Sequence, residues 1–212
     1  MRLILLRHGE TPWSAEHRYQ GATDTLLSDV GRAQVAALAE RLRGAAVNEF
    51  RSSPLRRTLD TAAAVAARHE APVVPDERLR EISFGRWEGL THEEIRRQAP
   101  ERYARWQADP GVATPPDGEP LASVLERVGD LWREVVAQPQ DATIALVGHG
   151  ACLRALLCVA LEVPTSAFWR FQLGAASVSE LYVYDGRAKL LLLNDRHHLN
   201  ANGAPPAGAH PF

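Results

Sequence analysis

The stretch Leu3-Ile4-Leu5-Leu6-Arg7-His8-Gly9-Glu10-Thr11 decides how this chain folds. A short apolar run that is followed by a glycine is typical of a buried strand, so we expect a strand over residues 2–7. Far downstream, Ile144-Ala145-Leu146-Val147-Gly148-His149-Gly150 repeats the design. Each stretch places a His-Gly pair where a buried strand should end.

The composition of the 212-residue chain is that of an ordinary soluble globular protein, with 45% apolar and 24% charged residues. The length suits one sizeable core and is rather long for two domains. We therefore predict one domain over residues 1–203, followed by a loosely held Pro/Gly/Ala-rich tail over 204–212. The formal net charge of −2 gives no global indication of a nucleic-acid or membrane partner.

The sequence also predicts a reduced, cytoplasmic protein. No secretory signal is visible, and no stretch approaches the roughly 20 apolar residues that span a bilayer. Cys152 and Cys158 fall six residues apart on a predicted helix. They should point to different sides of that helix, so we expect no disulfide between them.

Hydrophobic periodicity and capping residues predict alternating strands and helices. We expect a loop over residues 11–25, and a helix from the N-cap Ser28 to about residue 43. Another helix should start at Ser53-Pro54 and run to about residue 68. Thr91 and Glu94 form a predicted capping box. The other expected strands cover 49–52, 73–74, 143–147, 178–184 and 190–194, and the other expected helices cover about 91–107, 121–137 and 151–161.

Strands that alternate with helices favour an α/β fold, a three-layer sandwich with a mostly parallel central sheet flanked by helices. Ligands bind such sheets beyond the carboxyl ends of the strands. The loops after Leu6, Ser52 and Val147 should therefore share one rim. The aperiodic segment 79–120 is interpreted as an insertion that roofs the site.

The expected rim carries a chemically specific set of side chains: Arg7, His8, Arg56 or Arg57, and His149. Arginine supplies forked donors that match phosphate oxygens. A neutral imidazole is a good nucleophile near pH 7. A phosphate ester at this rim would meet guanidinium groups and two imidazoles, which indicates phosphoryl chemistry.

The chain resembles the histidine phosphatase superfamily, also called the phosphoglycerate mutase-like family. Arg7-His8-Gly9-Glu10-Thr11 resembles its opening motif. Further segments follow in the family's order, and together they cover residues 2 to about 155: Tyr19-Gln20-Gly21, Leu27-Ser28 with Gly31, Ser52-Ser53-Pro54-Leu55-Arg56-Arg57-Thr58, Leu79-Arg80-Glu81, Phe84-Gly85-Arg86-Trp87-Glu88-Gly89 and Val147-Gly148-His149-Gly150. The resemblance implies a phosphoglycerate mutase-like fold.

The resemblance also implies roles, residue by residue. His8 matches the nucleophile that becomes phosphorylated, and Arg7 and Arg57 match the two phosphate-binding arginines. His149 matches the second histidine on the phosphoryl group. Glu81 matches the proton donor, with Glu88 as its competitor. Where the family often has an asparagine six residues after the nucleophile, this chain has Ser14, whose hydroxyl is the candidate for that phosphate contact.

The resemblance favours the phosphatase branch, because residues 84–91 look like the phosphatase-type segment. It implies a phosphomonoesterase that needs no cofactor or metal and acts on a small phosphate ester through phosphohistidine. α-Ribazole-5′-phosphate, phosphoserine and a broad substrate range fit equally. A 2,3-bisphosphoglycerate-dependent phosphoglycerate mutase and a non-catalytic phospho-ligand binding module are the alternatives. A homodimer is possible through the last helix and strands.

The remaining polar and aromatic candidates have structural interpretations. The spacing around His197-His198 argues against a metal site, because no third ligand follows at a recognisable distance. The tryptophans Trp87, Trp106 and Trp169 are expected in the core or the roof. The other histidines are assigned to the surface or to loops: His17, His69, His92 and His210.

Overall fold

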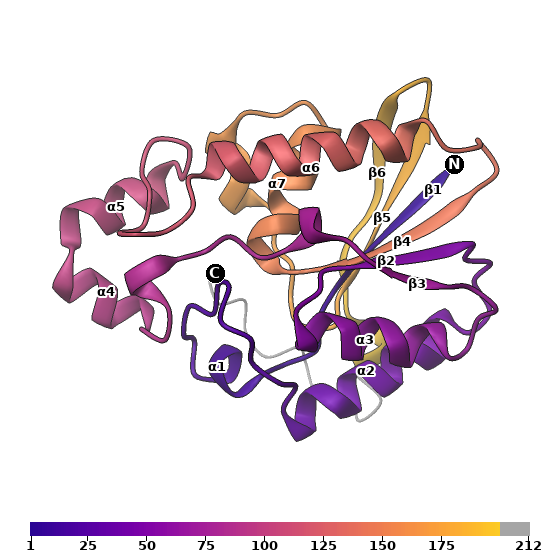
Figure 1. Ribbon diagram of the computed structural model, residues 1–212, viewed down its shortest axis with the longest axis horizontal. Coiled ribbons are helices and arrows are strands. Elements are labelled where there is room, and N and C mark those ends of the chain that lie inside the picture. Colours follow the sequence, from indigo (N-terminus) through magenta and orange to yellow (C-terminus); the bar gives the residue numbers. More distant parts are fainter. Residues whose placement is uncertain (200–212) are drawn as a thin grey trace.

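The computed structural model describes residues 1–199 and has a six-stranded central sheet in the order β3-β2-β4-β1-β5-β6 (Figure 1). The first four strands of that order pair in parallel, whereas β5 and β6 are antiparallel additions at one edge. The predicted α/β sandwich with a mostly parallel sheet is confirmed. The strands are β1 Arg2–Arg7, β2 Glu49–Ser52, β3 Val73–Pro75, β4 Thr143–Gly148, β5 Val178–Tyr184 and β6 Arg187–Asp195.

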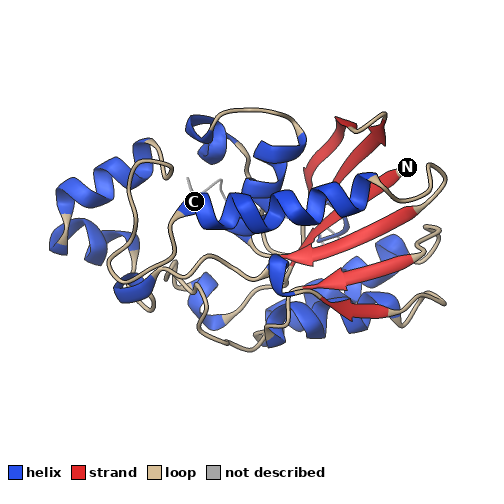
Figure 2. Cartoon of the chain, turned by 45° about the horizontal axis from the view of Figure 1, so that its top comes forward, coloured by secondary structure: helices blue, strands red, loops and turns tan. Residues whose placement is uncertain are grey.

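Helices cover both faces of the sheet (Figure 2). Successive side chains of a strand point to opposite faces. Leu3 and Leu5 of β1 therefore join the core beneath α6 and α7, whereas Ile4 and Leu6 join the core beneath α2 and α3. The α-helices are α1 Pro12–Ala15, α2 Asp29–Leu42, α3 Arg56–Ala66, α4 His92–Gln98, α5 Pro100–Ala108, α6 Leu121–Val136 and α7 Gly150–Ala160. Short 3-10 helices are η1 Glu77–Leu79, η2 Gly85–Trp87, η3 Thr165–Arg170 and η4 His197–Leu199.

The predicted helix caps have mixed outcomes. Ser28 caps α2 and accepts a hydrogen bond from the Gly31 amide, and Thr91 forms its capping box with Glu94, as expected. The start at Ser53-Pro54 is wrong, because α3 begins at Arg56 with Leu55 as the N-cap residue. The Ser53 hydroxyl instead lies 2.8 Å from His149 Nε2. It forms a hydrogen bond with a residue that is distant in sequence and does not cap the helix.

The expected loop over 11–25 also differs, because it contains the short helix α1. Thr11 caps this helix through the Ser14 amide, and the Ser14 hydroxyl accepts from the Thr11 amide in return. A single turn of helix has no room for a hydrophobic period, which explains why it escaped the pattern analysis.

The segment 79–120 contains α4 and α5, which project beyond the sheet (Figure 1). An edge-to-face aromatic cluster ties the segment to the rest of the protein, with Tyr19 packed on Phe84 at 4.6 Å between ring centroids and Trp106 packed on Trp169 at 5.8 Å. Its role as a roof and the single domain over 1–203 stay predictions, and the expected tail over 204–212 lies outside the described residues. Within residues 1–199, no helix combines the length and apolarity needed to cross a membrane.

Candidate active site

Parallel pairing brings the ends of three strands together at one edge of the sheet. Leu6 pairs with Val147, and Ser52 pairs with Val147 from the other side. The His8 amide donates to the Gly148 carbonyl at 3.1 Å, just beyond the paired residues. The rings of His8 and His149 consequently lie 5.2 Å apart between centroids, in an edge-to-face arrangement. The two His-Gly pairs of the sequence do share one rim.

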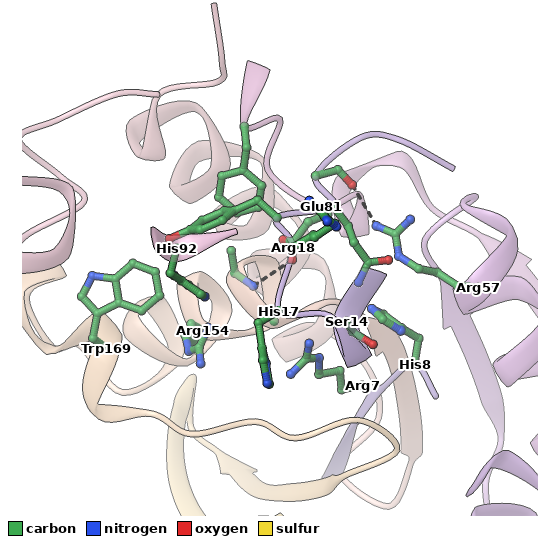
Figure 3. Close-up of a pocket in the computed structure, with 16 residues that line it drawn as sticks. Arg7, His8, Ser14, His17, Arg18, Arg57, Glu81, His92, Arg154 and Trp169 are labelled. Carbon is green, nitrogen blue, oxygen red and sulfur yellow. Dashed lines mark hydrogen bonds between the residues drawn. The ribbon is translucent and has the colours of Figure 1, made fainter. Parts of the chain in front are cut away.

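A pocket opens at this rim, with about 700 Å³ of space that communicates with solvent (Figure 3). Among the described residues, its charged lining consists of four arginines and one carboxylate: Arg7, Arg18, Arg57, Arg154 and Glu81. The remaining polar and aromatic lining includes His8, Ser14, His17, Gln20, His92 and Trp169. The excess of positive charge favours an anionic ligand.

His8 is held as a neutral imidazole with one defined tautomer. Its Nδ1 lies 2.7 Å from the Gly9 carbonyl oxygen. A carbonyl can only accept, so Nδ1 carries the proton and Nε2 keeps its lone pair. Burial, helped by the positive charges of Arg57 and Arg7, holds the His8 pKa well below its usual value. The ring is therefore poised as a nucleophile at neutral pH.

Arg57 is fully buried and held in place from three directions. Its Nη atoms donate to the carbonyls of Thr23 and Gly21, both at 2.8 Å, and its Nε donates to His149 Nδ1 at 3.2 Å. Burial lowers the Arg57 pKa to about 10, so the guanidinium is still charged at pH 7. Arg56, the neighbouring alternative, is exposed.

His149 lies behind the pocket wall and is not one of the residues that line it. Because Arg57 donates to Nδ1, the proton of the neutral ring sits on Nε2, which donates to the Ser53 hydroxyl. Burial, Arg57 and His8 keep the His149 pKa well below its usual value. His149 therefore supports His8 and Arg57 in this structure.

Arg7 offers an unsatisfied donor at the pocket. Its Nη1 donates to the Leu173 carbonyl. Its Nε is buried, and no hydrogen-bond partner for it lies among residues 1–199. A buried donor without a partner is unfavourable, and an oxygen of an anionic ligand would satisfy it. Burial lowers the Arg7 pKa from its ordinary value.

The two candidate acids have different surroundings. Glu81 lines the pocket, and its carboxylate accepts from the amides of Ala151 at 3.1 Å and Cys152 at 2.9 Å, in the first turn of α7. Glu88 accepts from the amides of Ala22, Thr23 and Phe84 and ties two loops together instead. The geometry favours Glu81 as the acid that faces a ligand.

Ser14 lines the pocket, but its hydroxyl is already engaged. It donates to the Thr11 carbonyl at 3.0 Å and accepts from the Thr11 amide at 2.9 Å. A phosphate contact would require the hydroxyl to turn away from Thr11. Gln20, which the sequence analysis did not select, also lines the pocket and is fixed by the hydroxyls of Thr11 and Thr25.

Further residues of the pocket wall were missed. His17 is exposed, as expected, but it lines the pocket with a left-handed φ of 56°. His92, which we expect at the surface or in a loop, instead begins α4 and forms a hydrogen bond with the Tyr103 hydroxyl at 2.6 Å. Arg154 was also missed, although a single arginine in the otherwise apolar α7 is a signal that the sequence contains. Trp169 stands beside it on the wall (Figure 3).

The site does not have the composition of a metal centre. Within residues 1–199, no cluster of three or more His, Cys, Asp or Glu side chains is arranged to hold a metal ion. The four arginines of the wall would also repel a cation. Cys152 and Cys158 are both buried and unpaired, as expected.

The pocket lies at the carboxyl ends of parallel strands and combines buried arginines, a neutral histidine and one carboxylate. This combination is typical of a phosphatase site with a histidine nucleophile. Family comparison agrees, because the family model of the histidine phosphatase superfamily (branch 1) matches residues 3–196. The chain belongs to this superfamily.

Several relatives carry phosphatase names. Phosphoserine phosphatase 1 of Hydrogenobacter thermophilus is 37% identical over 199 residues, which cover 94% of each chain. A solved mycobacterial glucosyl-3-phosphoglycerate phosphatase in complex with VO3 has a TM-score of 0.84 and 36% identity, and covers 91% of this chain and 98% of that one. The solved α-ribazole phosphatase of Shigella flexneri has a TM-score of 0.83 and 28% identity, with 92% and 97% coverage.

Proposed function

We propose that the protein is a phosphomonoesterase that hydrolyses a small phosphorylated metabolite through a phosphohistidine at His8. The observation that carries the proposal is the hydrogen bond from His8 Nδ1 to the Gly9 carbonyl, which leaves Nε2 as the free nitrogen of a neutral ring. Nε2 attacks phosphorus, the P–O bond to the leaving alcohol breaks, and the phosphoryl group moves to His8.

The arginines stabilise the charge on the transferred group. Arg7 and Arg57 both line the pocket together with His8 (Figure 3). Charge in phosphoryl transfer spreads over three oxygens, so donors fixed before the reaction are the main catalytic requirement. The carbonyls of Gly21 and Thr23 fix Arg57 in advance.

Glu81 moves the proton in both steps. In the first step it gives a proton to the oxygen of the leaving alcohol. In the second step its carboxylate takes a proton from the water that attacks phosphohistidine, which releases inorganic phosphate and restores His8. The amides of Ala151 and Cys152 keep the carboxyl group oriented throughout.

His149 and Ser14 adjust to the bound phosphoryl group. When Arg57 Nε turns to a phosphate oxygen, His149 Nδ1 is released. In contact with the dianion it can take up a proton and donate to the phosphoryl group. Ser14 contacts the phosphate if its hydroxyl proton leaves the Thr11 carbonyl.

Phosphatase names among the relatives support phosphatase activity and point to different substrates, whereas one relative that is 32% identical over 185 residues is named a probable phosphoglycerate mutase. Phosphoserine, glucosyl-3-phosphoglycerate and α-ribazole-5′-phosphate all remain candidates. We further propose that the activity needs no metal or cofactor and takes place in the cytoplasm. Tyr182 and Leu191 are exposed on the terminal strands, where a homodimer would form, and size-exclusion chromatography with light scattering tests this.

A panel of phosphate esters, with phosphate release measured for each, tests the function. We expect turnover of p-nitrophenyl phosphate and of at least one small metabolite. His8→Ala should abolish both while its circular dichroism stays that of the wild type. Isomerisation of 3-phosphoglycerate that depends on a bisphosphorylated primer would favour the mutase instead. Binding of the esters without any turnover would favour the binding module.

A further inference from the structure

Arg154 is a buried cation of the pocket that the proposed mechanism does not use. It is the charged residue of α7, it is 6% exposed, and it lines the pocket. Burial and the neighbouring Arg7 lower its pKa to about 10, so it keeps its charge at pH 7. Burial of a charged side chain is unfavourable unless a partner compensates for it. This arginine therefore requires an explanation.

The guanidinium of Arg154 is positioned by one hydrogen bond and by an aromatic ring. Its Nε donates to the Phe171 carbonyl at 2.7 Å. Its Cζ lies 5.2 Å from the centroid of the Trp169 ring, which supports the planar group from its face. Among residues 1–199, no hydrogen bond is found for its Nη atoms, so these donors can reach a ligand. A planar fork of this kind matches a carboxylate better than a single-point acceptor.

Arg154 stands next to the phosphate-binding end of the pocket. A Cβ on Gly150 would lie 3.5 Å from Arg154 Nη1 and 3.7 Å from Arg7 Cζ, so the two guanidiniums flank this glycine. Figure 3 shows Arg154 between Trp169 and Arg7 along the wall. Since Arg7 and Arg57 face the phosphoryl group, the Nη donors of Arg154 are placed for the part of the substrate that follows the ester oxygen.

We propose that Arg154 binds a carboxylate of the leaving group, so that the substrates are phosphomonoesters of hydroxy acids with the carboxylate a few bonds from the ester oxygen. The inference rests on the proposed phosphatase function and narrows it. Phosphoserine belongs to this class, whereas α-ribazole-5′-phosphate has no carboxylate. Trp169 is a positioning residue in this scheme, because its ring packs on the guanidinium and fixes where the group lies.

Two pairs of substrates that differ at the carboxylate test the proposal. Phosphoserine is compared with phosphoethanolamine, and 3-phosphoglycerate with glycerol 3-phosphate, by kcat/KM. One charge-assisted forked contact predicts a preference of about 10- to 100-fold for the carboxylated member of at least one pair. Arg154→Met should remove most of that preference, mainly through KM. The same substitution at the exposed Arg102 of α5 controls for the loss of a positive charge and should leave the preference intact.

The absence of a preference in both pairs would overturn the proposal, and so would a preference that survives Arg154→Met. An equal loss for both members of a pair leaves the preference unchanged and would assign Arg154 to the phosphoryl group instead. If the methionine variant does not fold, Arg154→Lys decides, because lysine keeps the charge and lacks the fork; an unaltered preference would again overturn the proposal. Turnover of p-nitrophenyl phosphate by the wild type separates this failure from failure of the phosphatase function itself.

Discussion

Replacement of Glu81 by glutamine tests the proposed proton transfer most sharply, because it changes the charge and hardly the shape. The carboxylate accepts three backbone amides: Ile82 at 3.0 Å and Cys152 at 2.9 Å on Oε1, and Ala151 at 3.1 Å on Oε2. A glutamine has one carbonyl oxygen and one NH2 group. Whichever way it turns, the NH2 group faces at least one amide donor.

The size of both effects follows from this geometry. One unsatisfied amide and one lost hydrogen bond should lower the free energy of unfolding by about 1–3 kcal/mol. For a chain of this length, each kcal/mol lowers the Tm by about 2–4 °C. Loss of the proton donor should lower kcat by about 10²- to 10⁴-fold. The drop should be largest for alkyl phosphates, whose leaving alkoxide needs a proton, and smaller for p-nitrophenyl phosphate, whose phenolate leaves without one.

The assay is kcat for both ester types together with thermal unfolding, and Glu88→Gln is the matched control. Glu88 also accepts three backbone amides, from Ala22, Thr23 and Phe84, and in addition the hydroxyls of Thr23 and Ser83, so its glutamine variant should lose at least as much stability. The ratio of alkyl to aryl turnover should fall only in the Glu81 variant. Equal ratios in the two variants, or alkyl turnover by Glu81→Gln at the wild-type rate, would refute the assignment.

Three further predictions concern Arg57, the buried histidines and the independence from metal ions. Arg57→Lys should lower kcat/KM by about 10²- to 10³-fold, because an ammonium cannot make the three hydrogen bonds of Arg57 to Gly21, Thr23 and His149 at once. Activity near the wild-type value would contradict the role of Arg57 in binding the phosphoryl group. Burial lowers the pKa values of His8 and His149 well below normal and that of His92 to about 4, whereas these rings are protonated near pH 6.5 in the unfolded chain. The free energy of unfolding contributed by the neutral rings is therefore fully present above about pH 6.5 and is lost as the pH falls towards 4. Calorimetry should show the Tm declining over that range, less steeply in His92→Asn, and a flat Tm would be inconsistent with buried neutral rings. EDTA should leave phosphate release unaffected, and restoration of a lost activity by a divalent cation would argue for a metal enzyme.

The strands and the rim could be predicted because local signals and tertiary structure agree there. The apolar run before Arg7 is buried on both faces of the sheet, so every residue of the run is apolar and the strand can be predicted from this segment alone. Parallel pairing then brings His8 to His149 by a general rule of α/β sheets. The motif order of the family assigned Arg57 and Glu81, and both lie on the pocket wall.

The errors arose where a long-range contact overrides a local preference. Ser53 has the features of a helix cap, but His149, distant in sequence, takes its hydroxyl. Arg154 lies on an apolar helix, and the apolar pattern predicts that the helix is buried. The pattern does not predict that the arginine faces this pocket. His17 and His92 both line the pocket, and a β-bridge between Arg18 and Thr91 joins the segments that carry them; nothing in their local sequence specifies this long-range contact.

The central claim, a covalent phosphohistidine at His8, is tested most directly by trapping the intermediate. The wild type and Glu81→Gln are mixed with p-nitrophenyl phosphate labelled in the phosphoryl group, whose leaving group needs no proton from Glu81, and stopped within one turnover under alkaline conditions, in which phosphohistidine survives. Peptide mass spectrometry should then find one phosphoryl group on His8, with more of it in the glutamine variant, because the attack of water on the intermediate is slowed. Phosphoryl label on any other side chain, or turnover without label on the protein at any time, would contradict the account.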